Sequence, residues 1–429
     1  MNECEKAMKQ KSVKNLIRNI ALVVLTLLMV VLTLLGGVSS VGGDVWERYR
    51  SLTHANLGYE VRSGDSPAAY PSSIAMTGMD GVLYGAAYNE RSTAQLYEVT
   101  RELMGSALGT AESFEALTED GLRDLLAGET LCYGYNGEIP LRALAVWLEG
   151  SCSSDLNISM LLLTADGSLA IRTRELGLVV SETTVDRNAW QRTASALGVG
   201  ACSYAGLSPA PVNERLAAET LIFDGVPVSA ELLVSEPPAF GDPNAADSLQ
   251  TLLSAFDYSV YARSYEERDG QVYVDNDSTI RVYEDGTVRY AAARRELEAE
   301  DAVLPLTDAI EQARVILERA QYSIGAGTQA ELLSASKNEE GGITLLFGLV
   351  FEGIPIQTSE PYACFDFADG QLIRAVIRLR RFSSDGSRQY ILPVQQAAAA
   401  SRRTNQRLGI AYMEGEAGHY AAERCFTFV

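Results

Sequence analysis

The sequence has almost no lysine after its first residues. Of the five lysines in 429 residues, four lie at Lys6, Lys9, Lys11 and Lys14, and the fifth is Lys337. The chain carries 35 basic and 56 acidic side chains, a formal net charge of −21. This excess of acid repels phosphate and excludes nucleic acid as the main partner. Because 47% of the residues are apolar, general disorder is excluded, and the length predicts two or three domains.

Histidine is also scarce. His54 and His419 are the only two, although imidazole is the usual proton-transfer group near neutral pH. His54 precedes the first predicted strand and His419 follows a turn glycine, so a solvated or structural role is favoured for both. The His-x-x-x-His, Gly-x-Ser-x-Gly, Walker and dinucleotide-binding patterns are absent, and so is Cys-x-x-Cys. We therefore expect a non-enzymatic protein with no catalytic, cofactor-binding or metal-binding residues.

Two patterns imitate known sites. Ser334-Ala-Ser-Lys337 fits the Ser-x-x-Lys motif of penicillin-binding enzymes, but no lysine follows that could supply their Lys-Thr-Gly element. Asp275-Asn-Asp-Ser-Thr279 begins like a calcium loop, but Ile280 and Gly286 stand where an EF-hand needs Gly and Glu. Both enzyme and EF-hand are rejected, while a weak surface cation site stays open.

Pairs of adjacent carboxylates leave a third alternative. Glu266-Glu267 and Glu339-Glu340 lie in polar turns, where such side chains are usually solvated. Two acids on facing strands could serve a carboxylate-dependent hydrolase, and one sequence does not give their separation. This enzyme is kept as the less favoured alternative.

The cysteines do not suggest a disulfide framework. Beyond Cys4 their number is odd and their spacing wide and irregular, at Cys132, Cys152, Cys202, Cys364 and Cys425. We expect small buried apolar side chains, and their pairing is left open.

A long apolar run near the N-terminus predicts a membrane anchor. Residues 20–35 are apolar except for two threonines, and residues 36–38 extend the uncharged run, which is longer than the apolar region of a signal peptide. The small residues 38–40 keep a cleaved signal open as the alternative. The preceding tail has five basic and two acidic side chains, a net of +3, so the rest of the chain carries −24. The positive-inside rule places the N-terminus in the cytoplasm and everything after about residue 41 outside.

The pattern of the exported part predicts an α+β fold of antiparallel sheets packed with helices. Hairpins are expected at Asp80-Gly81, Asp166-Gly167 and Asp224-Gly225, and a turn at Asn136-Gly137 before a helix opened by Pro140. Helices are predicted over 93–108, 113–126, 184–197, 247–256, 307–322 and 394–407. Strands are expected between them, in the C-terminal half at 259–263, 271–274, 280–283, 287–292, 330–336, 343–352, 354–358, 362–367, 371–380, 409–413 and 419–428.

Two short matches suggest an internal repeat. Leu304-Pro-Leu-Thr-Asp-Ala309 matches Leu392-Pro-Val-Gln-Gln-Ala397, each opening a helix, and Phe223–Val228 matches Phe351–Ile356. Chance similarity between turns of the same type is the alternative. With a linker at 235–243, the predicted divisions are a cytoplasmic tail (1–15), an anchor (16–38), a stalk (39–71), an N-terminal α+β domain (72–205), a central helix-sheet module (206–322) and a C-terminal helix-sheet module (323–429).

Four features together are similar to a known family: the basic tail with a single anchor, the stretch Leu125–Trp147, the strand-rich stretch Val272–Tyr290, and the C-terminal module that contains Phe351–Ile356 and Leu392–Ala397. In these features the chain resembles the YycH/YycI family of membrane-anchored regulators of the WalK-type sensor kinase in Gram-positive bacteria, and its C-terminal module is also similar to PepSY-type domains. The resemblance implies a non-enzymatic bacterial protein whose anchor and outer domains contact a sensor histidine kinase and a paralogous regulator.

We therefore expect a single-pass membrane protein that acts as an extracytoplasmic regulator or scaffold of a two-component system through protein–protein contact. The competing hypothesis is an exported binding module for a peptide or a cell-wall fragment.

Overall fold

The architecture is described from a computed structural model. It describes residues 67–428, apart from 199, 209, 211–213, 224–228, 241–245, 259–261, 276, 295–303, 339–340, 402–403 and 416–417. The predicted tail, the predicted anchor and residues 39–66 of the predicted stalk lie outside the described residues. Within the described part, no helix combines the length and the apolar character needed to span a bilayer.

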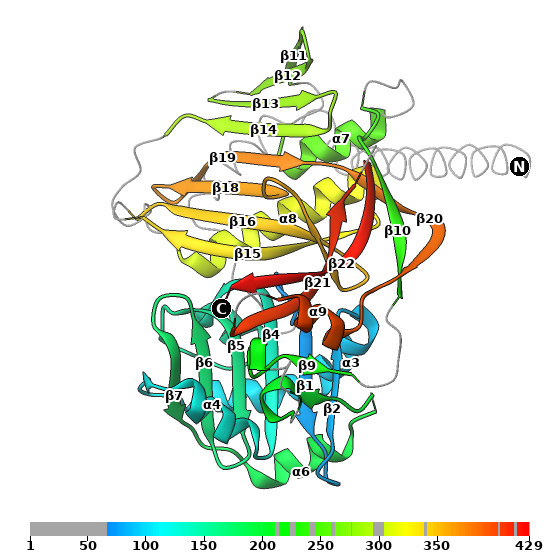
Figure 1. Cartoon of the computed structure of the whole chain (residues 1–429). Helices are drawn as coiled ribbons and strands as arrows, with labels where there is room; N and C mark the ends of the chain where they lie inside the picture. The colour runs from blue at the N-terminus through cyan, green and yellow to red at the C-terminus, as the bar shows by residue number, and fades with distance from the viewer. Residues whose placement is uncertain are drawn as a thin grey trace, which may run out of the picture. The chain divides into compact units, whose positions relative to one another are not determined.

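The described chain is α+β, with seven α-helices and a large, mostly antiparallel system of strands, as the sequence predicts (Figure 1). All described residues belong to one compact unit. Its strands form two sheets that meet at a single bridge, here called the N-terminal sheet (β1 to β7) and the C-terminal sheet (β10 to β22). A small third pairing joins β8 (Ser203–Tyr204) to β9 (Leu221–Ile222).

The N-terminal sheet is antiparallel in the order β2-β1-β4-β5-β6-β7-β3. Its strands are β1 (Ser73–Thr77), β2 (Leu83–Ala87), β3 (Glu115–Ala116), β4 (Thr130–Pro140), β5 (Asn157–Thr164), β6 (Ser168–Thr173) and β7 (Gly177–Glu182). The hairpins predicted at Asp80-Gly81 and Asp166-Gly167 are confirmed as β1–β2 and β5–β6. Gly81 and Gly167 have φ of 78° and 104°, which only glycine adopts freely.

Four helices accompany this sheet: α3 (Glu90–Leu108), α4 (Glu119–Leu126), α5 (Leu141–Trp147) and α6 (Arg187–Ser195). Helix α3 begins after Asn89, whose Oδ1 accepts the backbone N–H of Ser92 at 2.9 Å and satisfies one of the free donors of the first turn. The predicted inner face of α3 is buried, at Leu96, Thr100, Leu103 and Ala107. Pro140 immediately precedes α5, as predicted.

The C-terminal sheet runs β11-β12-β13-β14-β19-β18-β16-β15, and β17 connects β16 to the series β21-β22-β10-β20. Its strands are β10 (Ser229–Glu236), β11 (Arg263–Glu267), β12 (Gly270–Asp275), β13 (Ser278–Tyr283), β14 (Thr287–Ala292), β15 (Gln329–Lys337), β16 (Ile343–Phe351), β17 (Ile354–Gln357), β18 (Ala363–Ala368), β19 (Gln371–Arg378), β20 (Arg381–Tyr390), β21 (Gln406–Glu414) and β22 (His419–Phe428). Because β14 pairs with β19, the predicted central and C-terminal modules share this sheet, and their division stays a prediction.

Three helices belong to the same half: α7 (Ala246–Ala255), α8 (Leu306–Ile324) and α9 (Val394–Ala400). Helix α8 packs on β15 and β16, and α7 lies against α8 (Figure 1). Pro305 and Pro393 stand directly before α8 and α9, as the predicted repeat requires, since the fixed φ of proline suits a helix start. The predicted buried stripe of α8 is confirmed at Ile310, Ala313, Leu317 and Ala320.

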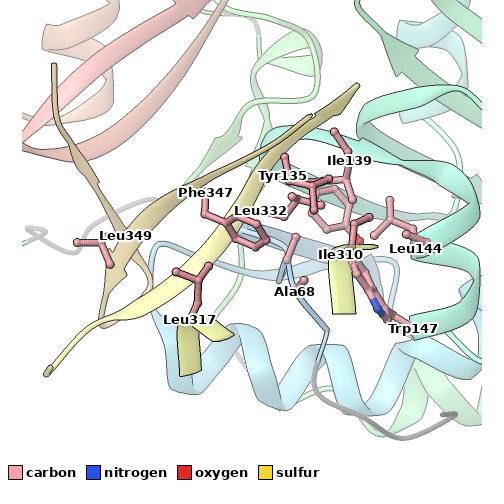
Figure 2. Packing of buried hydrophobic residues seen from close by; sticks show 14 of the residues in the cluster. Ala68, Tyr135, Ile139, Leu144, Trp147, Ile310, Leu317, Leu332, Phe347 and Leu349 are labelled. Atoms are coloured by element: carbon pink, nitrogen blue, oxygen red, sulfur yellow. The ribbon is translucent and has the colours of Figure 1, made fainter. Parts of the chain in front are cut away.

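The two sheets meet at a seam, defined here as residues 68–70, 136–138 and 331–334. Its single strand bridge is parallel, from Ser334 of β15 to Glu138 of β4. The backbones approach so closely that a Cβ at Gly137 would lie 2.3 Å from the carbonyl oxygen of Leu333. Beside the seam, Tyr135, Ile139 and Trp147 pack with Ile310, Leu317, Leu332 and Phe347 in one continuous apolar core (Figure 2).

Two predicted local features are wrong, one because of a helix cap and the other because of a contact at the seam. The helix predicted over 113–126 begins only after Thr118, whose Oγ1 accepts the N–H of Gly121 at 3.0 Å, while 115–116 pairs with β7. The turn predicted at Asn136-Gly137 does not form. Strand β4 continues to Pro140 with a shift of register after Gly134, and Gly137 is needed for the close contact with β15.

Three further differences concern strands that pair far along the sequence. The turn predicted at Asp224-Gly225 lies outside the described residues, and the strands on either side pair elsewhere within the described part, β9 with β8 and β10 with β20 and β22. The helix predicted over 394–407 ends at Ala400, and β21 begins at Gln406 after Asn405, which has a φ of 55°. Strand β20 was not predicted, because nearly all of its side chains are exposed and show no alternation of apolar and polar residues.

Candidate functional site: a cavity beneath the C-terminal hairpin

A cavity of about 570 Å³ lies between the N-terminal sheet and the β21–β22 hairpin, and is called here the C-terminal cavity. Ser73, Gly134 and Met160 line it from the sheet, and two more walls come from residues 219–223 and from residues 390, 391 and 393–395. The hairpin contributes Arg407, Leu408, Ile410 and Arg424. Four segments that are distant in sequence therefore build one largely apolar hollow with two guanidinium groups.

The segment 219–223 is held beside the hairpin by backbone contacts. Leu216 bridges Gln406 in parallel, and the N–H of Ala217 donates to the carbonyl oxygen of Gln406 at 2.9 Å. On the sheet side, Gly134 makes room for the hairpin, since a Cβ there would lie 2.2 Å from Nη2 of Arg407. The cavity walls are thus fixed by strand pairing and by one glycine.

The two arginines of the cavity differ in their partners. Nη1 of Arg407 donates to the carbonyl oxygens of Tyr135 at 2.7 Å and Ser159 at 3.3 Å. Arg424 donates through Nε to the carbonyl oxygen of Leu392 at 3.0 Å and forms no ion pair with a carboxylate of the described residues. Burial lowers the pKa of Arg424, and Tyr88 and Cys425 oppose this only partly. The cavity wall therefore holds a partly buried cation that has no carboxylate partner among the described residues.

The other titratable groups of the cavity are poor reagents. Burial raises the pKa of the Cys132 thiol to about 12, and burial also raises the pKa of Tyr88. Both remain protonated near neutral pH, and a thiol is a far weaker nucleophile than a thiolate. Glu219 lines the same wall but is engaged by Arg172. The arrangement favours binding over bond-making.

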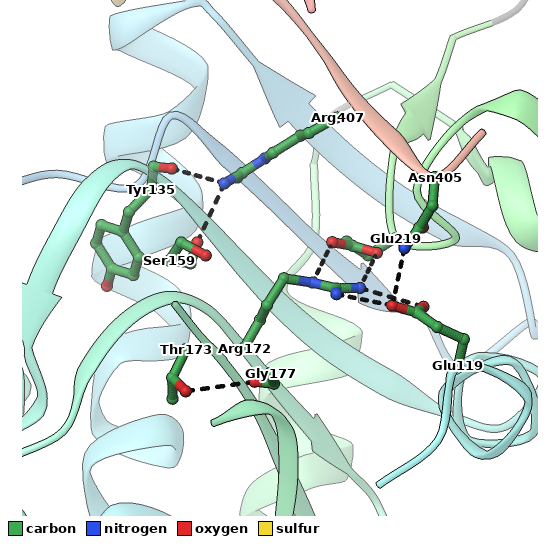
Figure 3. A network of polar contacts seen from close by, with 9 residues as sticks. All are labelled: Glu119, Tyr135, Ser159, Arg172, Thr173, Gly177, Glu219, Asn405 and Arg407. Carbon is green, nitrogen blue, oxygen red and sulfur yellow. Dashed lines mark hydrogen bonds and ion pairs between the residues drawn. The ribbon is translucent and has the colours of Figure 1, made fainter. Parts of the chain in front are cut away.

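A buried ion network supports the wall that carries Glu219 (Figure 3). Arg172 of β6, whose side chain is 7% exposed, donates Nε and Nη2 to Glu219 at 2.9 and 3.0 Å. Its Nη1 also donates to Glu119 at 2.9 Å, and Glu119 accepts Nδ2 of Asn405 at 3.0 Å. Burial alone would raise the pKa of Glu119, but the hydrogen bonds and charge of Arg172 outweigh it and the pKa is lowered. The network ties α4, β6, residue 219 and the start of β21 together.

A second cavity of about 380 Å³ lies at the seam. Glu331 lines it from β15 and accepts the N–H of Tyr70 at 3.2 Å and Nδ2 of Asn136 at 3.1 Å. Burial raises the pKa of Glu331 to about 7, because the two hydrogen bonds offset the loss of solvation only in part. This carboxyl group links the two halves of the fold and titrates near neutral pH.

The residues singled out in the sequence do not gather at either cavity. Ser334 and Lys337 lie on strand β15 and not at a helix start, as the rejection of the penicillin-binding motif expects. His419 begins β22, and Glu266 lies exposed on β11. His54 and the pair 339–340 lie outside the described residues. The five described cysteines are free thiols, of which Cys132 is buried and the other four are partly exposed.

Sequence reasoning missed the residues that make these sites. Arg172 had a local signal, because it is the one charged residue of the apolar strand Ser168–Thr173 and a buried arginine needs a counterion. Glu331 is likewise the one acidic residue of β15, but that strand contains more polar residues, so the indication of a buried charge is weaker. Arg407 and Arg424 lie on ordinary alternating strands, and nothing local distinguishes them from solvated arginines.

Among the described residues, no group of three histidine, cysteine or carboxylate side chains could hold a metal ion. No protein-family model, curated protein or solved structure matches the chain. The resemblance to the YycH/YycI family therefore stays a prediction from the sequence.

Proposed function

We propose that the protein is a membrane-anchored extracytoplasmic binding module that takes up a small ligand in the C-terminal cavity. The observation that carries this proposal is the cavity itself, an apolar hollow of about 570 Å³ with a small number of convergent polar groups. Such a composition is typical of sites that bury most of a ligand and orient it through a few directed contacts.

The chemistry of the walls favours a non-enzymatic role. A nucleophile needs an adjacent base or a lowered pKa, whereas burial raises the pKa of Cys132 and of Tyr88. Glu219 is held by two hydrogen bonds from Arg172 and is not available as a base. The groups at the cavity can position a ligand but are not arranged to transfer its protons.

The cellular placement rests on the sequence. The basic tail 1–15 and the predicted anchor 16–38, with its apolar run from residue 20, fit a single-pass anchor with its N-terminus in the cytoplasm. The binding part then lies outside the membrane, where peptides and wall fragments are available. The expected output is regulation of a sensor histidine kinase, which the anchor would contact within the bilayer.

A cavity-filling variant tests the binding function. The full-length chain in nanodiscs is screened by thermal unfolding against short peptides and cell-wall fragments. We expect a ligand to raise the unfolding temperature of the wild type and not that of Val394→Trp, because Val394 lines the cavity. Leu392→Trp is the matched control, since Leu392 is 46% exposed and does not line it. Stabilisation that survives in Val394→Trp contradicts the proposal, as does a panel without any stabilising member.

The regulatory output has a separate test. Crosslinking of the intact protein in its native membrane should recover a sensor kinase, and replacing residues 16–38 by an unrelated membrane helix should weaken regulation. Recovery of lipids or wall glycans alone would contradict a kinase partner. Full function after the anchor swap would mean that the exported part acts without the anchor's own contacts.

A further inference from the structure

We infer that the ligand of the C-terminal cavity is a short apolar peptide with a free C-terminal carboxylate, and that Arg424 binds this carboxylate. The inference rests on the proposed function, because it requires the cavity to be a ligand site. It adds the chemical class of the ligand and the residue that selects it.

Charge balance supplies the first argument. Arg424 has one hydrogen bond, from Nε to the carbonyl oxygen of Leu392, and no carboxylate partner among the described residues. A partly buried guanidinium that lacks a carboxylate partner loses solvation without compensation, so an anion that fills this position gains a charge-assisted contact. The planar guanidinium also matches a carboxylate in geometry, since two parallel N–H groups can reach its two oxygens.

The number of available cations favours a monoanion. Nη1 of Arg407, the second arginine of the cavity, already donates to the carbonyl oxygens of Tyr135 and Ser159. Glu219 adds a negative charge to the same wall, and its own countercharge is Arg172. A phosphate dianion would therefore meet one uncommitted guanidinium and a nearby carboxylate, whereas a carboxylate requires only the guanidinium.

The remaining walls favour a peptide over an acyl chain. Leu221, Phe223 and Val394 line the cavity, are partly exposed and offer apolar surface for side chains. Ser73 and Gln395, neither of them fully buried, also line the cavity and carry polar side chains. An acyl chain would leave such groups against methylenes at a cost in free energy, but peptide amides can bond to them.

The experiment compares ligands that differ only in the terminal group. Binding to the full-length chain in nanodiscs is measured by calorimetry for acetyl-Leu-Val-Leu as the free acid, for its C-terminal amide, for dodecanoate and for inorganic phosphate. We expect the wild type to bind the acid at least about tenfold more tightly than the amide, the range of one charge-assisted hydrogen bond. The preference should disappear in Arg424→Gln and persist in Arg381→Gln, a control at an exposed arginine outside the cavity.

Arg424→Lys keeps the charge and should retain part of the preference, and thermal unfolding shows whether each variant is folded. Equal binding of acid and amide to the wild type overturns the inference, as does a preference that survives in a folded Arg424→Gln. Tighter binding of dodecanoate or phosphate than of the acid peptide also overturns it and leaves the cavity as a site of another class. Peptide binding that is unchanged in Val394→Trp instead contradicts the proposed function, because the peptide then binds elsewhere.

Discussion

Replacing Glu331 by Gln should make the protein more stable at neutral and alkaline pH. Glu331 lies at the seam, 8% exposed, where it accepts hydrogen bonds from Tyr70 and Asn136. The amide of glutamine has nearly the same shape, and Asn136 can turn its own amide to accept the new N–H. The substitution therefore removes the charge while keeping contact with both halves of the fold.

The magnitude follows from the pKa of Glu331, which burial raises from 4.5 to about 7. Below pH 4.5 the carboxyl group is protonated in both the folded and the unfolded chain and has no effect on stability. Between pH 4.5 and 7 the unfolded chain loses this proton and the folded chain keeps it, so the free energy of unfolding falls as the pH rises. Above pH 7 the loss is complete and amounts to about 3 kcal/mol.

Urea unfolding from pH 4 to pH 8 measures this effect through the fluorescence of the buried Trp147 and Trp190. The difference in unfolding free energy between Glu331→Gln and the wild type should be small at pH 4.5 and grow in favour of the variant up to pH 7. Glu138 is a half-buried neighbour at the seam, and burial also raises its pKa. Because Glu138 is present in both proteins, its contribution to the pH dependence largely cancels in the difference. Glu266→Gln, at an exposed site, should show no such trend. A difference that is flat with pH, or a variant less stable at pH 8, would refute the reasoning.

Two further substitutions test the packing around the cavities. Arg172→Met should lower the free energy of unfolding by about 3–5 kcal/mol, because it leaves the buried Glu219 and the half-buried Glu119 without their countercharge. The double variant Arg172→Met with Glu219→Met should lose less stability than the sum of the two single losses. A loss below about 1 kcal/mol in urea unfolding would show that the network is not needed. Gly353→Ala should lower the free energy of unfolding by about 2 kcal/mol or more, since φ is 87° and the new Cβ would lie 2.5 Å from the backbone nitrogen of Glu90. Gly325→Ala is the comparison, at φ 60° with no neighbour within 4 Å, and should lower it by about 1 kcal/mol. Equal losses at the two glycines, measured as the shift in unfolding midpoint, would contradict the role assigned to the Gly353 contact.

The features that the sequence predicts well are those decided within a few residues. The buried stripe of α8 follows from helical periodicity, and the β5–β6 hairpin follows from Asp166-Gly167 between two apolar runs. The prolines before α8 and α9 are local in the same way. In each case the residues that determine the local structure lie within one short segment.

The features that the sequence misses depend on partners far along the chain. Strand β20 forms because β10 lies beside it, and residues 136–137 stay extended because β15 approaches Gly137. The ion network joins side chains at 119, 172, 219 and 405, so the lone arginine of β6 indicates a buried counterion without saying which carboxylate supplies it. The C-terminal cavity can be recognised only when these long-range pairings are known.

Photo-crosslinking from the cavity wall tests the central claim most directly. Phe223 lines the C-terminal cavity and can be replaced by p-benzoylphenylalanine, a photoreactive residue of related shape, and Tyr265 on β11 serves as the exposed control position. With acetyl-Leu-Val-Leu free acid and the full-length chain, irradiation should give a peptide adduct from position 223 and none from 265, and Arg424→Gln should reduce its yield. A folded protein that gives no adduct at 223, or equal adducts at both positions, would contradict a peptide site in this cavity.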